Sequence, residues 1–322
     1  MALHGLATLA VFTCTTSALP SRFGRTVAAL LFAAHPIHTE AVANVTGRSE
    51  LLCAILGLLA LQAYQSAGHR SWMGFLAAVW LAAGATLSKE TGMTVVGLMV
   101  AGDLIALFVT HHRLPAHAMP RWGLLAAACG AYFALRVWLS GYKFAPTFWS
   151  LDNPASFAES PVRQLSYCYL QGFNVWLLLW PQTLSADYSF DAIPLLYSCF
   201  DLRCLAPLAL YLGLAATAAH VMAKPRHPSS GPMAWAWVWL VLPFLPAAHI
   251  LATGAFVVAE RLLYMPSVGL CLALGHGCTV WGGKRRARVV GLLLAVTAAR
   301  TLARSRAWSA EETTTNLIHS SA

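Results

Sequence analysis

Long apolar stretches follow one another along almost the whole chain, with only short polar turns between them. A helix that crosses a bilayer needs about 20 mostly apolar residues. The stretches that approach this length cover residues 2–20, 26–41, 49–67, 72–88, 92–110, 122–140, 204–222, 234–252, 262–281 and 288–303. Charged residues make up 10% of the 322 positions, against roughly 25% in soluble domains. The sequence therefore predicts an all-α polytopic membrane protein with about ten transmembrane helices.

The polar turns are of two kinds, which differ in charge. One kind is basic and contains no Asp or Glu: residues 21–25, 69–70, 111–121, 224–227 and 284–288. The other kind holds nearly every carboxylate before the C-terminal tail: residues 35–50, 88–91, 141–166, 183–203 and 253–261. Lys and Arg accumulate in cytoplasmic loops, so the basic turns predict the cytosolic side and the acidic turns the opposite side. The net charge of +9 follows from this orientation and does not indicate a nucleic-acid partner.

Residues 167–182 form a shorter apolar segment, which Gly172, Asn174 and Pro181 interrupt. A full crossing here would reverse the sidedness of every later basic turn. We therefore interpret the segment as re-entrant or as lying in the membrane interface.

The turn His35–Glu50 carries two histidines, two carboxylates and an arginine between apolar stretches. A bilayer tolerates such groups when they reach water, pair with one another or line a polar cavity. Pro36 lacks a backbone donor, so the preceding helix should end or bend there. A polar hairpin between two helices would explain the turn without any function. Paired His, Glu and Arg, in place of Ser, Asn or Lys, favour a functional site. The sequon Asn44-Val45-Thr46 lies so close to the predicted membrane that we expect it to stay unmodified.

Two further turns place a carboxylate beside a cation at the edge of an apolar stretch: Glu260 with Arg261, and Lys89 with Glu90. Each is either a structural ion pair or part of a phosphate-binding site. The forked donors of Arg261 suit a phosphate.

The eight cysteines form no Cys-x-x-Cys pair, and no metal-ligand spacing occurs, so we predict no metal site. Cys199 and Cys204 could pair in an oxidising compartment, but spacing alone does not decide this. Four scattered histidines are more simply structural: His4, His220, His249 and His276.

Five motifs occur in a fixed order along the chain: HPIHTEAVANVTGRSELL from His35, LSKETGMTV from Leu87, DNPA from Asp152, NVWLLLWPQTLSADYS from Asn174 and VVAERLLYMPSVG from Val257. Together they resemble the transmembrane and tetratricopeptide-repeat O-mannosyltransferases that target cadherins. The resemblance covers most of the chain, and the first and last motifs are the most specific.

The resemblance implies a GT-C membrane fold in the endoplasmic reticulum. It also implies transfer of mannose from the membrane lipid dolichyl phosphate mannose to Ser or Thr hydroxyls of luminal proteins such as cadherins, without a cofactor. Residues 1–303 then form the membrane domain, and residues 304–322 a luminal junction toward tetratricopeptide repeats. Family members carry an earlier span and a large acidic luminal loop before the matching region. We therefore interpret this chain as a fragment, a partial gene model or a splice form.

The predicted site combines two carboxylates with a set of donor-binding groups. Glu40 and Glu260 are expected to orient or deprotonate the acceptor. The groups expected to bind the donor phosphate or sugar are Arg261, Lys89, Arg48, Glu90, His35 and His38. A non-catalytic scaffold or a transporter is the alternative, but the charges lie at span ends and no inverted repeat is visible, which favours an enzyme. A GT-C enzyme with another sugar or acceptor also stays open.

Overall fold

The computed structural model describes residues 1–67, 71–111, 118–141, 148–182, 184–185, 188–250, 253–280 and 285–309. The basic turn at 69–70, parts of the turns at 111–121 and 141–166, and the junction beyond residue 309 lie outside these residues. The α-helices are α1 Ala2–Cys14, α2 Arg22–Ala34, α3 Thr39–Ala43, α4 Arg48–Ala67, α5 Trp72–Ser88, α6 Thr94–Ala106, α7 Ala118–Leu139, α8 Pro154–Phe157, α9 Val162–Leu179, α10 Leu205–Ala223, α11 Ser230–Val241, α12 Ser267–Val280 and α13 Arg286–Ser309. Short helical turns are η1 Pro36–His38, η2 Glu90–Met93, η3 Leu107–His111, η4 Leu202–Cys204, η5 Leu245–Ala247 and η6 Glu260–Leu263.

All regular secondary structure in the described residues is helical, which confirms the predicted all-α class. The helices long and apolar enough to cross a membrane are Arg48–Ala67, Glu90–Val109, Ala118–Leu139 and Leu202–Ala223. Shorter apolar helices are Ala2–Cys14, Trp72–Ser88 and Ser267–Val280. The chain is a polytopic membrane protein, and the number of about ten crossings stays a prediction.

Prolines set the ends of three helices. α2 ends two residues before Pro36, so the predicted span 26–41 is wrong at its C-terminal end. α11 ends two residues before Pro243, inside the predicted span 234–252. α12 begins directly after Pro266. In each case proline either lacks the N–H that the helix needs or restricts the residue before it.

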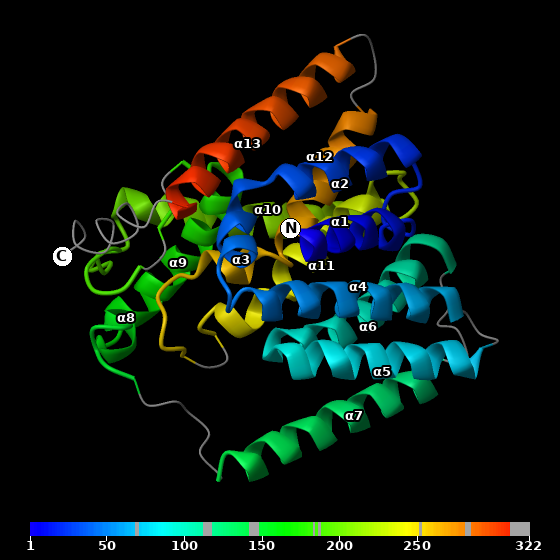
Figure 1. The fold of residues 1–322 in the computed structure, drawn as a ribbon, viewed down its shortest axis with the longest axis horizontal. Helices are drawn as coiled ribbons and strands as arrows, with labels where there is room; N and C mark the ends of the chain where they lie inside the picture. Colours follow the sequence, from blue (N-terminus) through cyan, green and yellow to red (C-terminus); the bar gives the residue numbers. More distant parts are fainter. Residues whose placement is uncertain are drawn as a thin grey trace.

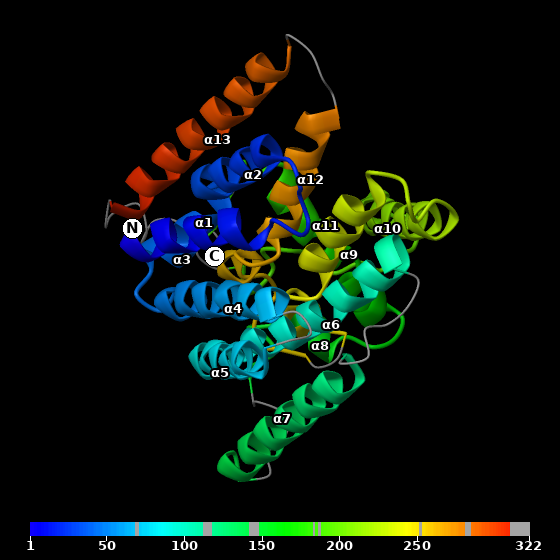
Figure 2. The same ribbon diagram turned by 90° about the vertical axis from the view of Figure 1, so that its right-hand side faces the viewer.

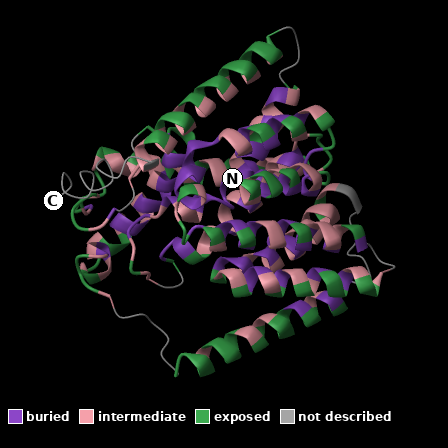
Figure 3. Ribbon diagram, in the orientation of Figure 1, coloured by how far each residue is buried: buried purple, intermediate pink, exposed green. Residues whose placement is uncertain are grey.

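The helices form a bundle with α13 and α7 at opposite edges (Figures 1 and 2). α4 and α5 lie side by side near the middle of Figure 1, and among the described helices they pack against each other most extensively. Buried residues gather in the helices between the two edges, while α7 and α13 are largely exposed (Figure 3). In a membrane, such outer helices face lipid or further protein.

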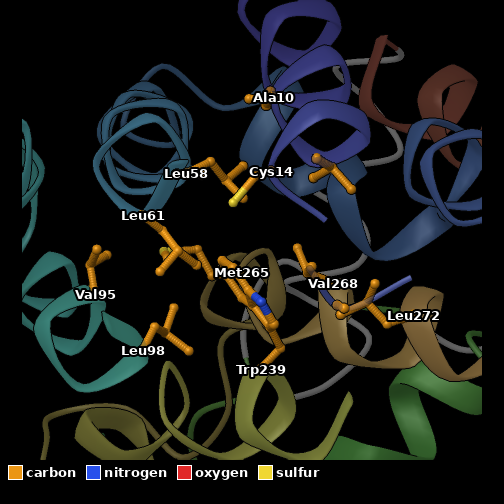
Figure 4. Packing of buried hydrophobic residues seen from close by; sticks show 14 of the residues in the cluster. Ala10, Cys14, Leu58, Leu61, Val95, Leu98, Trp239, Met265, Val268 and Leu272 are labelled. Carbon is orange, nitrogen blue, oxygen red and sulfur yellow. The ribbon is translucent and has the colours of Figure 1, made fainter. Parts of the chain in front are cut away.

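The core of the bundle surrounds Trp239 of α11, which is 1% exposed. Figure 4 shows the apolar side chains that converge around it: Leu58 and Leu61 of α4, Val95 and Leu98 of α6, Met265, and Val268 and Leu272 of α12. The core therefore joins elements that are far apart in the sequence.

Asp103 lies within the predicted span 92–110, outside the acidic turns, and accepts two hydrogen bonds. The Tyr64 hydroxyl donates to its Oδ2 at 2.6 Å, and the Trp122 ring nitrogen donates to the same oxygen at 2.9 Å. A carboxylate that is half-buried in an apolar bundle, as Asp103 is, needs such partners. Asp103 thus connects α6 to α4 and α7.

The segment 167–182 lies mostly within α9, which runs through Gly172 and Asn174 without a break. The chain after α9 returns to the beginning of the helix, where the Leu196 N–H donates to Ser166 Oγ at 2.9 Å. The chain therefore comes back to the start of α9, and the re-entrant or interfacial placement of the segment stays a prediction. The first part of this path, up to Leu179, is one continuous helix, α9.

Close packing of α11 on α12 depends on Gly269. A Cβ at this position would lie 2.6 Å from the Leu240 backbone nitrogen and would also meet the Ala236 carbonyl oxygen. Because both are backbone atoms, the two helices would have to separate. We expect Gly269→Ala to lower the free energy of unfolding by about 1–3 kcal/mol, measured by chemical unfolding in detergent.

Gly277 of the same helix provides the control. A Cβ there meets nothing within 4 Å, and alanine is favoured over glycine in a helix by up to about 1 kcal/mol. Gly277→Ala should be neutral or stabilising. Equal unfolding curves for the two variants would contradict the close approach of α11 and α12.

Candidate functional site

The acidic turns meet at one end of the bundle. Direct contacts join them in pairs: Glu40–Arg261 joins 35–50 to 253–261, Glu50–Lys89 joins 35–50 to 88–91, Tyr188–Glu260 joins 183–203 to 253–261, and Asn153–Gly254 joins 141–166 to 253–261. At the other end, Arg286 lies 3.9 Å above the Phe23 ring and joins two basic turns. Figure 1 shows these ends on the left and right. The gathering of carboxylates at one end is therefore confirmed.

Glu40 is 1% exposed and accepts two hydrogen bonds from one residue, Arg261. The Arg261 backbone N–H donates to Glu40 Oε2 at 2.8 Å, and Arg261 Nη1 donates to Oε1 at 2.8 Å. The pair thereby fixes the start of η6 against α3. This is the turn that holds Glu260.

Glu260 is fully buried. The Tyr188 hydroxyl donates to its Oε1 at 2.9 Å, and Arg304 Nη2 lies 3.7 Å from the same oxygen. Its Oε2 is buried and has no hydrogen-bond partner among the described residues. Burial, with a smaller contribution from the nearby charge of Glu40, raises the pKa of Glu260 to about 7 against the opposing effects of Arg304 and Tyr188. A carboxyl group with a pKa near neutrality can exchange a proton at physiological pH.

Both partners of Glu260 line a cavity of about 990 Å³ between α9 and α13. Its walls are Pro36, Tyr169, Phe173, Pro181, Gln182, Leu184, Ser185, Tyr188, Ala192, Ile193, Pro194, Arg203, Arg300, Ala303, Arg304 and Ala307. This volume lies at the upper end of the range for ligand pockets. Tyr188 and Arg304 therefore stand between Glu260 and an open space.

α13 brings Arg304 to this cavity because the helix continues through residue 303, the predicted domain boundary. The Thr301 hydroxyl donates to the Ala34 carbonyl oxygen at 2.6 Å and holds α13 against the end of α2. Arg300, one helical turn before Arg304, also lines the cavity. Its guanidinium lies 4.4 Å above the Trp180 ring.

Lys89 and Glu90 contribute to two ion pairs beside this region. Lys89 pairs with the buried Glu50, and Glu90 pairs with Arg136 on α7. A smaller pocket of about 370 Å³ is lined by Lys89, Glu90 and Arg136. Arg48 is exposed at the first position of α4. These residues share the acidic end with Glu260, but they do not line the large cavity.

The two predicted histidines are held by the fold. His35 Nε2 lies 3.0 Å from the Leu178 carbonyl oxygen, and its Nδ1 accepts from the Ile37 N–H. His38 Nε2 lies 2.8 Å from Ser267 Oγ, and its ring packs 4.6 Å from the Tyr264 ring. A donor that bound His35 would have to displace one of these hydrogen bonds.

No group of three or more His, Cys, Asp or Glu side chains that could hold a metal ion occurs among the described residues. Cys199 and Cys204 are separate thiols.

Sequence reasoning missed three residues of this site: Tyr188, Arg300 and Arg304. Tyr188 reaches Glu260 through a contact between residues 72 positions apart, which no local pattern reports. Arg300 and Arg304 did carry a signal, because their spacing of four places them on one face of a helix. They also lie on the acidic side, where the distribution of charges in membrane proteins disfavours arginine.

The fold and the site define an all-α polytopic membrane protein with a polar cavity and buried carboxylates at one end of its helix bundle. Residues 143–215 match the family model described as "Protein O-mannosyl-transferase TMTC, DUF1736". The chain is similar to this family over those residues, and to its curated members over most of its own length.

Three curated relatives illustrate the similarity. The protein O-mannosyl-transferase TMTC4 of Homo sapiens is 36% identical over 89% of this chain and 43% of its own length. Tmtc3 of Drosophila melanogaster is 37% identical over 78% of this chain and 31% of its own. TMTC1 of Homo sapiens is 33% identical over 85% and 35%. The chain thus spans between 31% and 43% of the length of these relatives, and no solved structure matches it.

Proposed function

We propose that the chain carries the membrane-embedded catalytic part of a GT-C-type protein O-mannosyltransferase of the endoplasmic reticulum. It transfers mannose from dolichyl phosphate mannose to Ser or Thr hydroxyls of luminal proteins, cadherins among them. The names of the relatives support O-mannosyl transfer as the activity. The donor, the acceptor and the compartment are those that the family resemblance implies.

The observation that carries the proposal is the position of Glu260 directly behind the wall of the large cavity. Its carboxylate accepts from Tyr188, whose ring lines that cavity. A base acts on a hydroxyl within hydrogen-bond reach, either directly or through one intervening group. Tyr188 supplies such a group between an acceptor in the cavity and Glu260.

The reaction then proceeds as an inverting displacement. The acceptor hydroxyl oxygen forms a bond to C1 of mannose, while the bond between C1 and the phosphate oxygen breaks and dolichyl phosphate leaves with the electron pair. The acceptor proton passes to the Tyr188 oxygen, and the Tyr188 proton passes to Glu260 Oε1. Glu260 ends the step neutral and releases its proton before the next turnover.

Glu40 and Arg261 receive a positioning role in this scheme. The sequence predicts that Glu40 acts on the acceptor and Arg261 on the phosphate, whereas the hydrogen bonds between them fix η6 and hence the Glu260 carboxylate. Lys89, Glu90 and Arg48 stay candidates for contacts with the donor sugar at the edge of the site. His35 and His38 are assigned to holding η1 against α9 and α12.

The pH dependence of transfer tests the role of Glu260. A base is active when deprotonated, and Glu260 has a pKa of about 7. The transfer rate should therefore rise about tenfold per pH unit below pH 7 and level off above it. The measurement is kcat/KM for an acceptor peptide between pH 5 and 9, and the slope of its logarithm against pH below pH 7 should be about one. A profile that is flat through this range would exclude Glu260 as the base.

A cell-based experiment tests the activity itself. The gene that encodes the chain is deleted, and O-linked mannose on secretory glycopeptides is measured by mass spectrometry. The wild-type gene should restore O-mannose that the deletion removes. Unchanged O-mannose after deletion would contradict the proposed function.

A further inference from the structure

The cavity between α9 and α13 is strongly basic. Three arginines line it, Arg203, Arg300 and Arg304, and no carboxylate does so among the described residues. Two carboxylates lie behind this wall: Asp201 pairs with Arg203, and Glu260 pairs with Arg304. Arginines that converge on one space can form an anion-binding site where their N–H donors are not all used by acidic partners.

The three arginines differ in how many donors they have left. The Arg203 side chain donates three hydrogen bonds to Asp201, one of 2.7 Å and two of 3.1 Å, and its Nη1 donates to the Pro194 carbonyl oxygen. Its role is to fold the 194–204 segment against the cavity. Arg203 is therefore not the residue that would bind an anion.

Arg304 and Arg300 are less fully engaged. Arg304 has a single ion-pair partner, Glu260, at the long distance of 3.7 Å, and its Nε is buried without a hydrogen-bond partner among the described residues. The Arg300 guanidinium carbon lies 4.4 Å from the centre of the Trp180 ring, and this cation–π contact does not use the N–H donors. Side chains four residues apart on a helix are neighbours, so the two guanidinium groups can reach oxygens of one anion.

The rest of the cavity suits a lipid carrier. Phe173, Leu184 and Ile193 line it with apolar side chains, and α13 borders it on the outside of the bundle (Figures 1 and 2). We propose that Arg300 and Arg304 bind the phosphate of a polyprenyl-phosphate-linked donor in this cavity. The identity of the carrier rests on the proposed function. The site replaces Arg261, which pairs with Glu40 away from the cavity walls.

The arrangement also gives the site a chemical purpose. Negative charge grows on the leaving phosphate as the bond to the sugar breaks, and fixed cations stabilise that charge. Arg304 contacts Glu260 on one side and the cavity on the other. It therefore places the phosphate beside the group that removes the acceptor proton.

Binding of dolichyl phosphate to the full chain in lipid nanodiscs tests the proposal. Arg300→Gln and Arg304→Gln should each raise its Kd at least about tenfold, because each removes a charge-assisted contact. Binding of uncharged dolichol should not change. Arg306→Gln is the matched control, since Arg306 is exposed on the same helix and does not line the cavity.

Three outcomes would overturn the inference. One is wild-type affinity for dolichyl phosphate in both Arg300→Gln and Arg304→Gln. Another is an equal loss in Arg306→Gln, and the third is competition by inorganic phosphate at the affinity of the lipid, which would make the site one for a free anion. If Arg304→Gln does not fold, the affinity of Arg300→Gln for dolichyl phosphate tests the inference alone, because this variant leaves the ion pair between Arg304 and Glu260 intact.

The test separates this site from the proposed function. Arginine-dependent binding of dolichyl phosphate without any mannosyl transfer would refute the function and keep the site. Mannosyl transfer at the wild-type rate in Arg300→Gln and Arg304→Gln would refute the site and keep the function.

Discussion

Glu260→Gln is expected to lower the rate of mannosyl transfer by at least about 100-fold, within the range of about 10²–10⁴ that a general base contributes. Glutamine keeps an oxygen that can accept from the Tyr188 hydroxyl, but it cannot take up a proton. The fold around the site should therefore persist while the proton has no acceptor. The measurement is kcat with dolichyl phosphate mannose and an acceptor peptide, with the donor KM determined alongside.

The split between kcat and KM distinguishes a base from a structural carboxylate. The loss of the Glu260 charge frees Arg304, so donor binding should be retained or become tighter. Glu159→Gln is the matched control, because Glu159 is exposed in an acidic turn ahead of α9. Wild-type kcat in Glu260→Gln, or a loss confined to KM, would remove Glu260 from the chemistry.

The fold was predictable from sequence where composition and helix-breaking residues agree. The apolar stretches 49–67 and 72–88 correspond closely to α4 and α5. α13 departs from its prediction of 288–303, because apolarity ends near residue 303 while the helix continues to Ser309. Helical propensity and contacts with α2 extend a helix beyond its apolar part. Apolarity thus locates membrane segments better than it locates helix ends.

The candidate site was predictable only as far as local patterns reach. The adjacent charges in Glu260-Arg261 and Lys89-Glu90 marked four residues that do gather at one end of the bundle. The pattern did not say which partner each charge would find. Arg261 forms an ion pair with Glu40, 221 positions away in the sequence. Glu260 accepts a hydrogen bond from Tyr188 and forms an ion pair with Arg304. Such pairings depend on how the helices pack against one another, and the sequence of a single element carries no information about that packing.

Removing the Glu40 side chain should destabilise the fold. Glu40→Ala breaks two charge-assisted hydrogen bonds to Arg261, and breaking a buried ion pair costs about 3–5 kcal/mol. Because the Arg261 side chain is 35% exposed, we expect the lower end, about 3 kcal/mol, in chemical unfolding in detergent. Glu90→Ala is the matched control, since Glu90 and Arg136 are both more than half exposed and such pairs contribute about 0–1 kcal/mol. Equal losses in the two variants would contradict a buried anchor.

The positioning role of Glu40 also predicts a change in the pH profile. Its negative charge raises the pKa of Glu260, so Glu40→Gln should move the midpoint of the rate profile below its wild-type position near pH 7. Glutamine still accepts from the Arg261 N–H, and the turn that holds Glu260 should therefore stay in place. A purely structural Glu40 would lower the rate at every pH without moving the midpoint. Glu40→Asp keeps the negative charge and should therefore keep the midpoint near its wild-type position. That result would show that residue 40 of the 35–50 turn acts on Glu260 in η6 through its charge.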